Sequence, residues 1–238
     1  MNPIWPITIV GCGGIGGIII QAISHLHGAS GEDVQIMIVD GDVFESENRE
    51  RQYFVRPGEN KAKHCAELMR QRYPLLKIYA VTEYLDERNA FLVIKNGHII
   101  FSCVDNHYAR KLISLQCDDV ENVVLINGGN ERNNGASQIS IRMNGQWLTP
   151  ALHDIYPEIL DATQPVRIQP GCIAQAVTDS QLYLTNFVIA SDMLRLYFSW
   201  LNRHLWSVSP NAGLSMPPVN EIFTDLLLVK SRSNLFNP

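Results

Sequence analysis

The chain lacks an apolar run long enough to cross a membrane, and it has no surplus of basic residues. A membrane-spanning helix needs about 18 or more consecutive apolar residues, whereas the best candidate, 182–205, contains Asn186, Asp192, Arg195 and Asn202. Lys and Arg number 19 against 24 Asp and Glu, a formal net charge of −5. Such a chain carries no general electrostatic footprint for nucleic acid or anionic lipid. The N-terminus shows no secretory signal pattern, so we expect a cytoplasmic location.

Paired cysteines are also missing. The five cysteines (Cys12, Cys65, Cys103, Cys117 and Cys172) are scattered, and no two of them form a CxxC pair. This usage suits a reducing compartment better than a disulfide framework, and it argues against structural zinc. Because free cysteine is among the most buried residue types, Cys65, Cys103 and Cys117 are expected in the core and Cys12 in loop packing.

Strands and helices alternate along the first part of the chain. Continuous apolar runs, typical of parallel strands buried on both faces, are expected as strands at 4–10, 34–39, 78–81, 98–104 and 123–127. Helices are expected at 15–27, 60–72, 106–117 and 172–204, and a strand at 137–143 runs into an Asn144-Gly145 hairpin turn. A last strand is expected within 222–229. The pattern predicts an α/β fold with a Rossmann-like, doubly wound, largely parallel sheet and antiparallel C-terminal strands.

Three regions are expected within this one domain. Residues 1–146 form a nucleotide-binding core, and residues 172–238 supply a C-terminal helix and tail that complete the same domain. Between them, residues 147–171 carry four prolines and are expected as a long irregular loop. Loops of that length are uncommon in compact domains and are often functional.

A glycine cluster and an acidic residue indicate a nucleotide site. Gly11, Gly13, Gly14 and Gly16 form a GxGxxG motif between a strand and a helix. There the glycines permit a tight turn, and the helix N-terminus attracts phosphate. Asp40 ends the next strand, where a carboxylate can bind both ribose hydroxyls. The alternative for Asp40 is a helix or turn cap.

The residues that follow favour a triphosphate over a dinucleotide. Two cationic and two amide side chains follow Asp40 in the sequence, namely Asn48, Arg51, Gln52 and Lys61. Their charge exceeds what the two phosphates of a dinucleotide require, so a nicotinamide oxidoreductase is disfavoured. Asp105 ends another strand and could hold Mg²⁺ between phosphates.

The combination of these segments resembles the ThiF/MoeB/HesA family, the superfamily of ubiquitin-activating enzymes. The segments are GCGGIGG, VDGDVFESENRERQ, GENKA and FSCVDN, and the similarity covers about 1–205. The resemblance implies ATP·Mg²⁺-dependent adenylation of a carboxylate, usually the C-terminal glycine of a ubiquitin-like protein. It matches Gly11, Gly13, Gly14 and Gly16 to the phosphate loop, Asp40 to the ribose acid, Asn48, Arg51, Gln52 and Lys61 to the triphosphate clamp, and Asp105 to the metal-linked acid. Arg110 resembles a structural arginine.

Later segments are similar to the plasmid-borne ThiF proteins of the PRTRC type. They are LHDIYP, PGC and QLYLTN. That likeness implies a ubiquitin-like partner ending in Gly-Gly and a conjugating-enzyme-like neighbour, and the family implies a homodimer. The apolar stretch 194–206 is expected in the core, with a homodimer seam as the alternative.

Several positions depart from the family pattern. The zinc-binding CxxC pairs are missing, and no counterpart is present for the amino-terminal Arg that reaches into a partner's ATP site. Arg132 or Arg142 could substitute for that Arg. Ser102 replaces the usual acid three residues before Asp105, and Arg49 stands where a Leu is common.

Cys172 lies where the irregular loop meets the expected helix N-terminus, a location that lowers a thiol pKa. The resemblance implies uptake of acyl or sulfur near this position. The alternatives are a small apolar residue at a helix start or a substrate contact without covalent chemistry.

The leading hypothesis is therefore an ATP-dependent adenylyltransferase that uses Arg51, Lys61 and Asp105 and passes its product to Cys172. One alternative is adenylation of a small carboxylate or a tRNA base, and another is a non-catalytic ATP-binding partner subunit.

Overall fold

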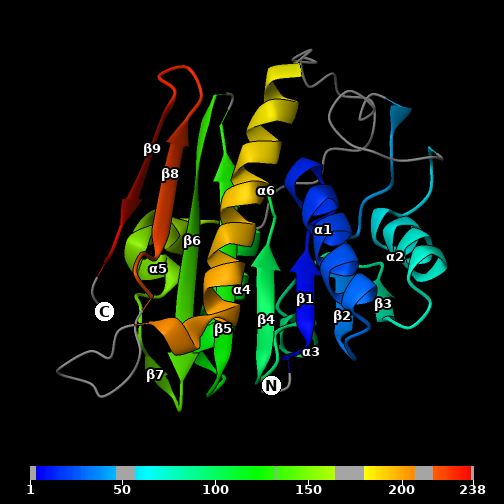
Figure 1. Ribbon diagram of the computed structural model, residues 1–238, viewed down its shortest axis with the longest axis horizontal. Coiled ribbons are helices and arrows are strands. Elements are labelled where there is room, and N and C mark those ends of the chain that lie inside the picture. The colour runs from blue at the N-terminus through cyan, green and yellow to red at the C-terminus, as the bar shows by residue number, and fades with distance from the viewer. Residues whose placement is uncertain (1–3, 47–56, 132, 164–179, 207–216, 237–238) are drawn as a thin grey trace.

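The computed structural model describes residues 4–46, 57–131, 133–163, 180–206 and 217–236. Within these residues nine strands form one sheet in the order β3-β2-β1-β4-β5-β6-β8-β9, with β7 paired to β6 (Figure 1). The strands are β1 (Ile7–Val10), β2 (Gln35–Val39), β3 (Lys77–Val81), β4 (His98–Ser102), β5 (Val123–Asn130), β6 (Asn134–Met143), β7 (Gln146–Trp147), β8 (Glu221–Asp225) and β9 (Lys230–Asn234). The first five strands by number are parallel, and the others pair antiparallel. The expected fold class is confirmed.

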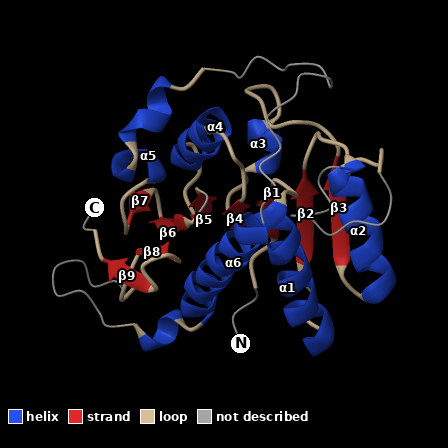
Figure 2. Cartoon of the chain, turned by 90° about the horizontal axis from the view of Figure 1, so that it is seen from above, coloured by secondary structure: helices blue, strands red, loops and turns tan. Residues whose placement is uncertain are grey.

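Helices cover both faces of the sheet (Figure 2). On one face, α1 (Gly14–Ser30), α2 (Lys61–Arg72) and α6 (Ser180–Leu201) pack on apolar side chains that include Ile9, Ile38, Phe101 and Ile126. On the other face, α3 (Ala90–Val93), α4 (His107–Asp118) and α5 (Leu152–Ile155) cover a second apolar cluster. None of the helices in the described part of the chain is both long and apolar enough to span a membrane.

The strand order explains where a ligand would meet the fold. The chain adds β2 and β3 on one side of β1 and then crosses to add β4 and β5 on the other side. The space beyond the carboxyl ends of β1 and β4 is therefore a topological switch point, where α/β folds bind their ligands. Backbone hydrogen bonds join the end of β1 to both neighbouring strands, since Gly11 N donates to Val39 O of β2 and Cys103 N donates to Val10 O of β1.

Local sequence signals explain several element boundaries. Asn106 caps α4, because its Oδ1 accepts from Ala109 N at 2.8 Å. Asn144 and Gly145 both have positive φ, as the expected hairpin turn between β6 and β7 requires. α1 ends at Gly31, which adopts the left-handed conformation that glycine tolerates best.

One expectation about elements was wrong, and another was right only in part. The segment 147–171 is not irregular throughout, because it contains α5 and a short 3-10 helix, Pro157–Asp161. Pro157 starts that helix, at a position where the missing N–H of proline costs nothing. The strand expected within 222–229 is present as β8 but ends at Asp225, and it is not the last strand, because the chain turns and forms β9.

Candidate functional site

The glycine motif forms a tight turn between β1 and α1. Gly11 has φ of +92°, and a Cβ there would lie 2.6 Å from Cys103 O. A Cβ at Gly16 would lie 1.9 Å from Gly11 O. The motif therefore needs glycine at both positions, one for its backbone conformation and one for close contact within the turn.

The first turn of α1 is left open for an anion. Gly13 is the N-cap, no side chain caps the helix there, and the first turn has no acidic residue. The leading N–H groups of a helix have no partners within the helix, and the helix dipole makes this end electropositive. This arrangement suits a phosphate.

Asp40 lies beside the glycine turn. Its Oδ2 accepts from Cys12 N at 2.6 Å, and its Oδ1 accepts from Asp42 N at 2.8 Å. Burial raises the pKa of the Asp40 carboxyl above its ordinary value, while these two N–H groups and Lys61 act in the opposite direction. Because each carboxylate oxygen has further lone pairs, both oxygens can still accept from hydroxyl groups.

Lys61 comes to the same place from the start of α2. Its Nζ lies 3.3 Å from Asp42 Oδ2, and its side chain is almost completely buried. The hydroxyl of Tyr84 also donates to the Asp42 carboxylate. Asp42 thus fixes the ammonium group within reach of the groups that surround Asp40.

Asn60 joins α2 to the loop that carries Asp40. Its Oδ1 accepts from Lys63 N at 3.0 Å as the N-cap of α2. Its Nδ2 donates to Asp40 O at 2.8 Å and to Asp42 O at 3.0 Å. One side chain therefore sets the start of the helix and the position of both acidic residues.

Asp105 follows the end of β4, on the far side of β1 from Asp40. It is exposed, and Asn106 Nδ2 lies 3.4 Å from its Oδ1. An exposed carboxylate at a strand end suits Mg²⁺, which proteins commonly hold with one or two carboxylates plus substrate phosphates. No cluster of three metal-binding side chains occurs in the described ranges, so such an ion would depend on phosphate oxygens.

Arg110 projects from α4 toward the end of β5. Its Nη2 donates to Val104 O at 2.9 Å, and a Cβ at Gly129 would lie 2.7 Å from the same nitrogen. Burial lowers the pKa of the guanidinium, an effect opposed by Asp105 and Tyr156. The missing side chain at Gly129 thus makes room for the Arg110 guanidinium beside Asp105.

The structure therefore brings together Gly11, Gly13, Gly14, Gly16, Asp40 and Lys61 around one turn, with Asp105 at the neighbouring strand end. Four other expected site residues lie outside the described residues, namely Asn48, Arg51, Gln52 and Cys172, as does Arg132. Arg142 is described, but its Nε donates to Val120 O after α4 and its guanidinium lies over Trp147.

The described cysteines are mostly buried. Cys12, Cys103 and Cys117 are buried as expected, and burial raises the pKa of each thiol. Cys65 is partly buried and packs against the core. Cys65 was expected in the core, and it lies at the edge of the core cluster.

Some side chains at the site were missed from the sequence. Tyr84 reaches Asp42 from a distant segment, where its hydroxyl donates to the carboxylate. Asn186 reaches the glycine turn from α6, and a Cβ at Gly14 would lie 2.0 Å from Asn186 Nδ2. Asn186 belongs to the QLYLTN segment, which carried a signal of similarity but no indication of this contact. Nothing in the local sequence marks Tyr84.

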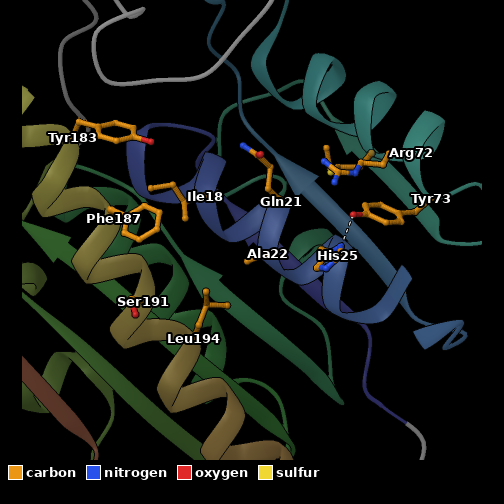
Figure 3. Close-up of a pocket in the computed structure, with 11 residues that line it drawn as sticks. Ile18, Gln21, Ala22, His25, Arg72, Tyr73, Tyr183, Phe187, Ser191 and Leu194 are labelled. Atoms are coloured by element: carbon orange, nitrogen blue, oxygen red, sulfur yellow. Dashed lines mark hydrogen bonds between the residues drawn. The ribbon is translucent and has the colours of Figure 1, made fainter. Parts of the chain in front are cut away.

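A separate cavity of about 420 Å³ lies between α1, α2 and α6 (Figure 3). Tyr183 and Phe187 line it from α6, and Gln21 and His25 line it from α1, where His25 Nδ1 lies 2.8 Å from Tyr73 Oη. None of the site residues named above lines it. The cavity is mainly apolar and is distinct from the switch point.

Comparisons with known proteins give one matching family and several relatives. Residues 6–226 match the model of the ThiF family. Adenylyltransferase and sulfurtransferase UBA4 from Lodderomyces elongisporus is 27% identical over 194 residues, which are 80% of this chain and 40% of that protein. The Kluyveromyces lactis protein of the same name is 28% identical over 111 residues, 45% of this chain and 24% of that protein.

Solved structures of E. coli MccB show the same fold. The structure with ATP has a TM-score of 0.66 and 16% sequence identity, and the match covers 98% of this chain and 64% of MccB. The structure with AMPCPP and MccA gives the same values. This chain thus spans less than two thirds of the length of either kind of relative. Because the family model matches nearly the whole chain and agrees with the fold and the glycine turn, this chain belongs to the ThiF family.

Proposed function

We propose that the protein is an ATP-dependent adenylyltransferase that activates a carboxylate. The observation that carries the proposal is the meeting of four features at the switch point: the glycine turn, the uncapped N-terminus of α1, Asp40 and Lys61. The adenylyltransferase name of the UBA4 relatives and the ATP in an MccB structure support the same reaction class.

Each residue has a role that follows from its chemistry. Asp40 accepts the ribose hydroxyls, and the α1 N-terminus with the glycine turn binds phosphate oxygens. Lys61 and Arg51 neutralise charge at the α-phosphate, while Asn48 and Gln52 donate hydrogen bonds to the triphosphate. Mg²⁺, when bound to the phosphates, would offset their charge, and Asp105 would hold it.

The reaction needs positioning more than proton transfer. A substrate carboxylate is already ionised at neutral pH, so no general base is required. One of its oxygens forms a bond to the α-phosphorus, and the bond between that phosphorus and the bridging oxygen breaks. Pyrophosphate leaves with the electron pair. Cations fixed before the reaction stabilise the charge that develops on the phosphates.

The substrate that we propose is the C-terminal carboxylate of a ubiquitin-like protein that ends in Gly-Gly. The similarity of LHDIYP, PGC and QLYLTN to PRTRC-type proteins supports this substrate, with transfer to Cys172 and a conjugating-enzyme-like protein as later steps. Small carboxylates and modified tRNA bases are the alternatives. We also propose a homodimer in the cytoplasm. Exposed Phe198 and Leu205 on the expected seam support the dimer, whereas Leu196, Tyr197 and Trp200 are in the core.

Exchange of labelled pyrophosphate into ATP tests the proposal. We expect Arg51→Ala and Lys61→Met to lower exchange by about 100-fold or more, as loss of a charge-stabilising group typically does. The methionine keeps most of the buried aliphatic part of the Lys61 side chain. The matched control is Lys63→Ala, because Lys63 lies two residues farther along α2 and is exposed. Removing the terminal glycine of the partner should abolish exchange.

The opposite results are equally informative. Normal exchange in folded Arg51→Ala and Lys61→Met contradicts the adenylation site proposed here. Tight ATP binding without exchange toward any carboxylate favours a non-catalytic ATP-binding subunit.

A further inference from the structure

Two cysteine side chains that take no part in the proposed adenylation meet beside the glycine turn. Cys12 is the second residue of the glycine motif, and Cys65 lies on α2. Their thiols are in hydrogen-bond contact. Cys12 is almost completely buried in the main apolar cluster, and Cys65 packs against the same cluster. Two oxidisable sulfurs from distant parts of the chain therefore lie side by side next to the nucleotide site.

A cavity of about 360 Å³ between α1 and α2 gives small molecules access to Cys65. Gln21 from α1 and Leu68 and Arg72 from α2 line it together with Cys65. Gln21 and Arg72 also line the neighbouring cavity (Figure 3). A space of this size has room for several molecules as small as water. Cys12 does not line the cavity and is only 1% exposed, so a small oxidant meets Cys65 first.

The environment of Cys12 suits the second step of an oxidation rather than the first. The thiolate is the reactive form of cysteine. Burial, and after it the contact with Cys65, raises the pKa of the Cys12 thiol well above its ordinary value. Cys12 is therefore protonated at neutral pH and does not attack a free oxidant. Its contact with Cys65 makes a later attack on that sulfur intramolecular, which offsets the low fraction of thiolate.

A bond between the two sulfurs would move the glycine turn. A disulfide holds its sulfurs about 2.05 Å apart, closer than two thiols in hydrogen-bond contact. The turn has no free space to absorb this movement, because a Cβ at Gly16 would lie only 1.9 Å from Gly11 O. Cys12 N donates to Asp40 Oδ2 at 2.6 Å. A shift of Cys12 therefore disturbs the hydrogen bond that positions the carboxylate proposed for the ribose.

The same bond would act on the other side of the site through α2. Lys61 and Cys65 are four residues apart on this helix, so their side chains lie on the same face. Lys61 Nζ lies 3.3 Å from Asp42 Oδ2, in the position from which it is proposed to reach the α-phosphate. A link from Cys65 to Cys12 thus changes the turn and the helix that together form the phosphate site.

We propose that Cys12 and Cys65 form a reversible disulfide in the presence of peroxide and that this bond closes the ATP site. The inference rests on the proposed ATP site and adds a regulation to it. Disulfides in a reducing compartment, such as the cytoplasm that we propose, are usually transient and catalytic or redox-sensing.

Hydrogen peroxide supplies the oxidising equivalents. The Cys65 thiolate attacks one peroxide oxygen, the O–O bond breaks, and hydroxide leaves and takes up the proton that Cys65 had lost, so that Cys65 becomes a sulfenic acid. The Cys12 sulfur then attacks the Cys65 sulfur, the S–O bond breaks, and the hydroxyl leaves as water with the proton of Cys12. Two thiols and one peroxide thus give one disulfide and two waters, and a dithiol reductant restores both thiols.

Peptide mass spectrometry tests whether the bond forms. The protein is treated with hydrogen peroxide, its remaining thiols are alkylated, and the digest is searched for peptides joined through Cys12 and Cys65. We expect this pair in the unmodified protein and its loss after treatment with dithiothreitol. Cys12→Ala should instead retain Cys65 as a sulfenic acid that dimedone traps. The absence of the joined peptides, or a disulfide of Cys65 with Cys172 in their place, overturns the inference.

ATP titration of the reduced and oxidised protein tests whether the bond closes the site. We expect oxidation to weaken ATP binding by about tenfold or more, the effect of losing one hydrogen bond to a charged group, and dithiothreitol to restore it. Cys65→Ala should bind ATP as the reduced protein does and should not respond to peroxide. Cys117→Ala is the matched control, because Cys117 is also buried but belongs to the apolar cluster on the other face of the sheet, so its response should equal that of the unmodified protein. Unchanged ATP binding by the disulfide-linked protein overturns the closure.

The inference and the proposed function fail in different ways. A reduced protein that binds no ATP rejects the nucleotide site and with it the closure, even where the disulfide forms. A reduced protein that binds ATP and exchanges pyrophosphate, but forms no bond between Cys12 and Cys65, retains adenylation and rejects the regulation.

Discussion

Gly16 and Gly17 are adjacent glycines in the first turn of α1 with opposite requirements. A Cβ at Gly16 would lie 1.9 Å from Gly11 O, whereas a Cβ at Gly17 would have no neighbour within 4 Å. The shape of the turn thus requires glycine at position 16, whereas a side chain at position 17 would meet no described neighbour. The last glycine of the motif therefore cannot tolerate a side chain, whereas the glycine that follows it can.

This difference predicts opposite effects of two alanine substitutions. Gly16→Ala should lower the free energy of unfolding by about 1–3 kcal/mol and weaken ATP binding, because the backbone of the turn must move. Gly17→Ala should stabilise the protein by about 0.5–1 kcal/mol, because alanine lowers the entropy of the unfolded chain. Urea unfolding and ATP titration measure both effects. Equal stability of the two variants would contradict the described turn.

Signals in the sequence predicted those candidate site residues whose contacts are local. Gly11 and Gly16 belong to the turn after β1, and Asp40 directly follows β2, the next strand in the chain. Their spacing in the sequence therefore predicts that they lie close together. Tyr84 and Asn186 could not be found in this way, because their contacts with Asp42 and Gly14 join segments far apart in the chain. Only the folded sheet brings these segments together.

At the scale of elements, apolar composition was a less reliable guide than local hydrogen bonds. Leu227, Leu228 and Val229 belong to the apolar run expected as a strand, yet all three are exposed. Leu228 N donates to Asp225 Oδ1 at 3.0 Å, which stabilises the turn between β8 and β9. A side-chain acceptor at the end of β8 thus ended the strand despite the hydrophobic residues that follow.

The start of β4 provides a prediction about pH. His98 Nδ1 lies 3.2 Å from Thr8 Oγ1, and burial together with Lys95 lowers the pKa of His98 to about 4. The unfolded chain has an ordinary histidine pKa of about 6.5. The unfolded state therefore binds a proton first as pH falls, and the contribution of His98 to stability, complete above about pH 6.5, is lost toward pH 4.

We expect His98→Gln to make stability less sensitive to acid. Between pH 7 and pH 5 the unmodified protein should lose about 1 kcal/mol more of its unfolding free energy than the variant, a value reduced for a half-buried ring. Urea unfolding at the two pH values measures this difference. Parallel losses in both proteins would show that His98 titrates similarly in the folded and unfolded chains.

At the scale of the whole molecule, α6 connects the N-terminal half to the later strands. Ile189 and Met193 lie over Gly128 and Gly135, where a Cβ would come within 2.7 Å of one of these side chains. Farther along α6, Tyr197 Oη lies 2.8 Å from His27 Nε2 on α1, and His27 Nδ1 lies 2.5 Å from Glu32. Small residues on the sheet and one buried polar contact thus set the position of the helix.

The contact between Tyr197 and His27 predicts a selective loss of stability. Tyr197→Phe keeps the buried ring but leaves His27 Nε2 without its partner, so unfolding free energy should fall by about 1–2 kcal/mol. Tyr79→Phe is the control, because Tyr79 is about half exposed on β3 and should change stability by less than about 0.5 kcal/mol. Thermal and urea unfolding compare the two. A neutral Tyr197→Phe would mean that the hydroxyl does not help to hold α6.

The late place of α6 in the chain has a consequence for biosynthesis. A ribosome completes β1, β4, β5 and β6 before it makes the helix that covers Ile126 and Ile139 on their shared face. Until about residue 201 has emerged, the nascent chain exposes this apolar surface, and exposed surfaces of this kind favour aggregation. Translation pauses before α6 should therefore increase the need for chaperones, whereas pauses after it should matter much less.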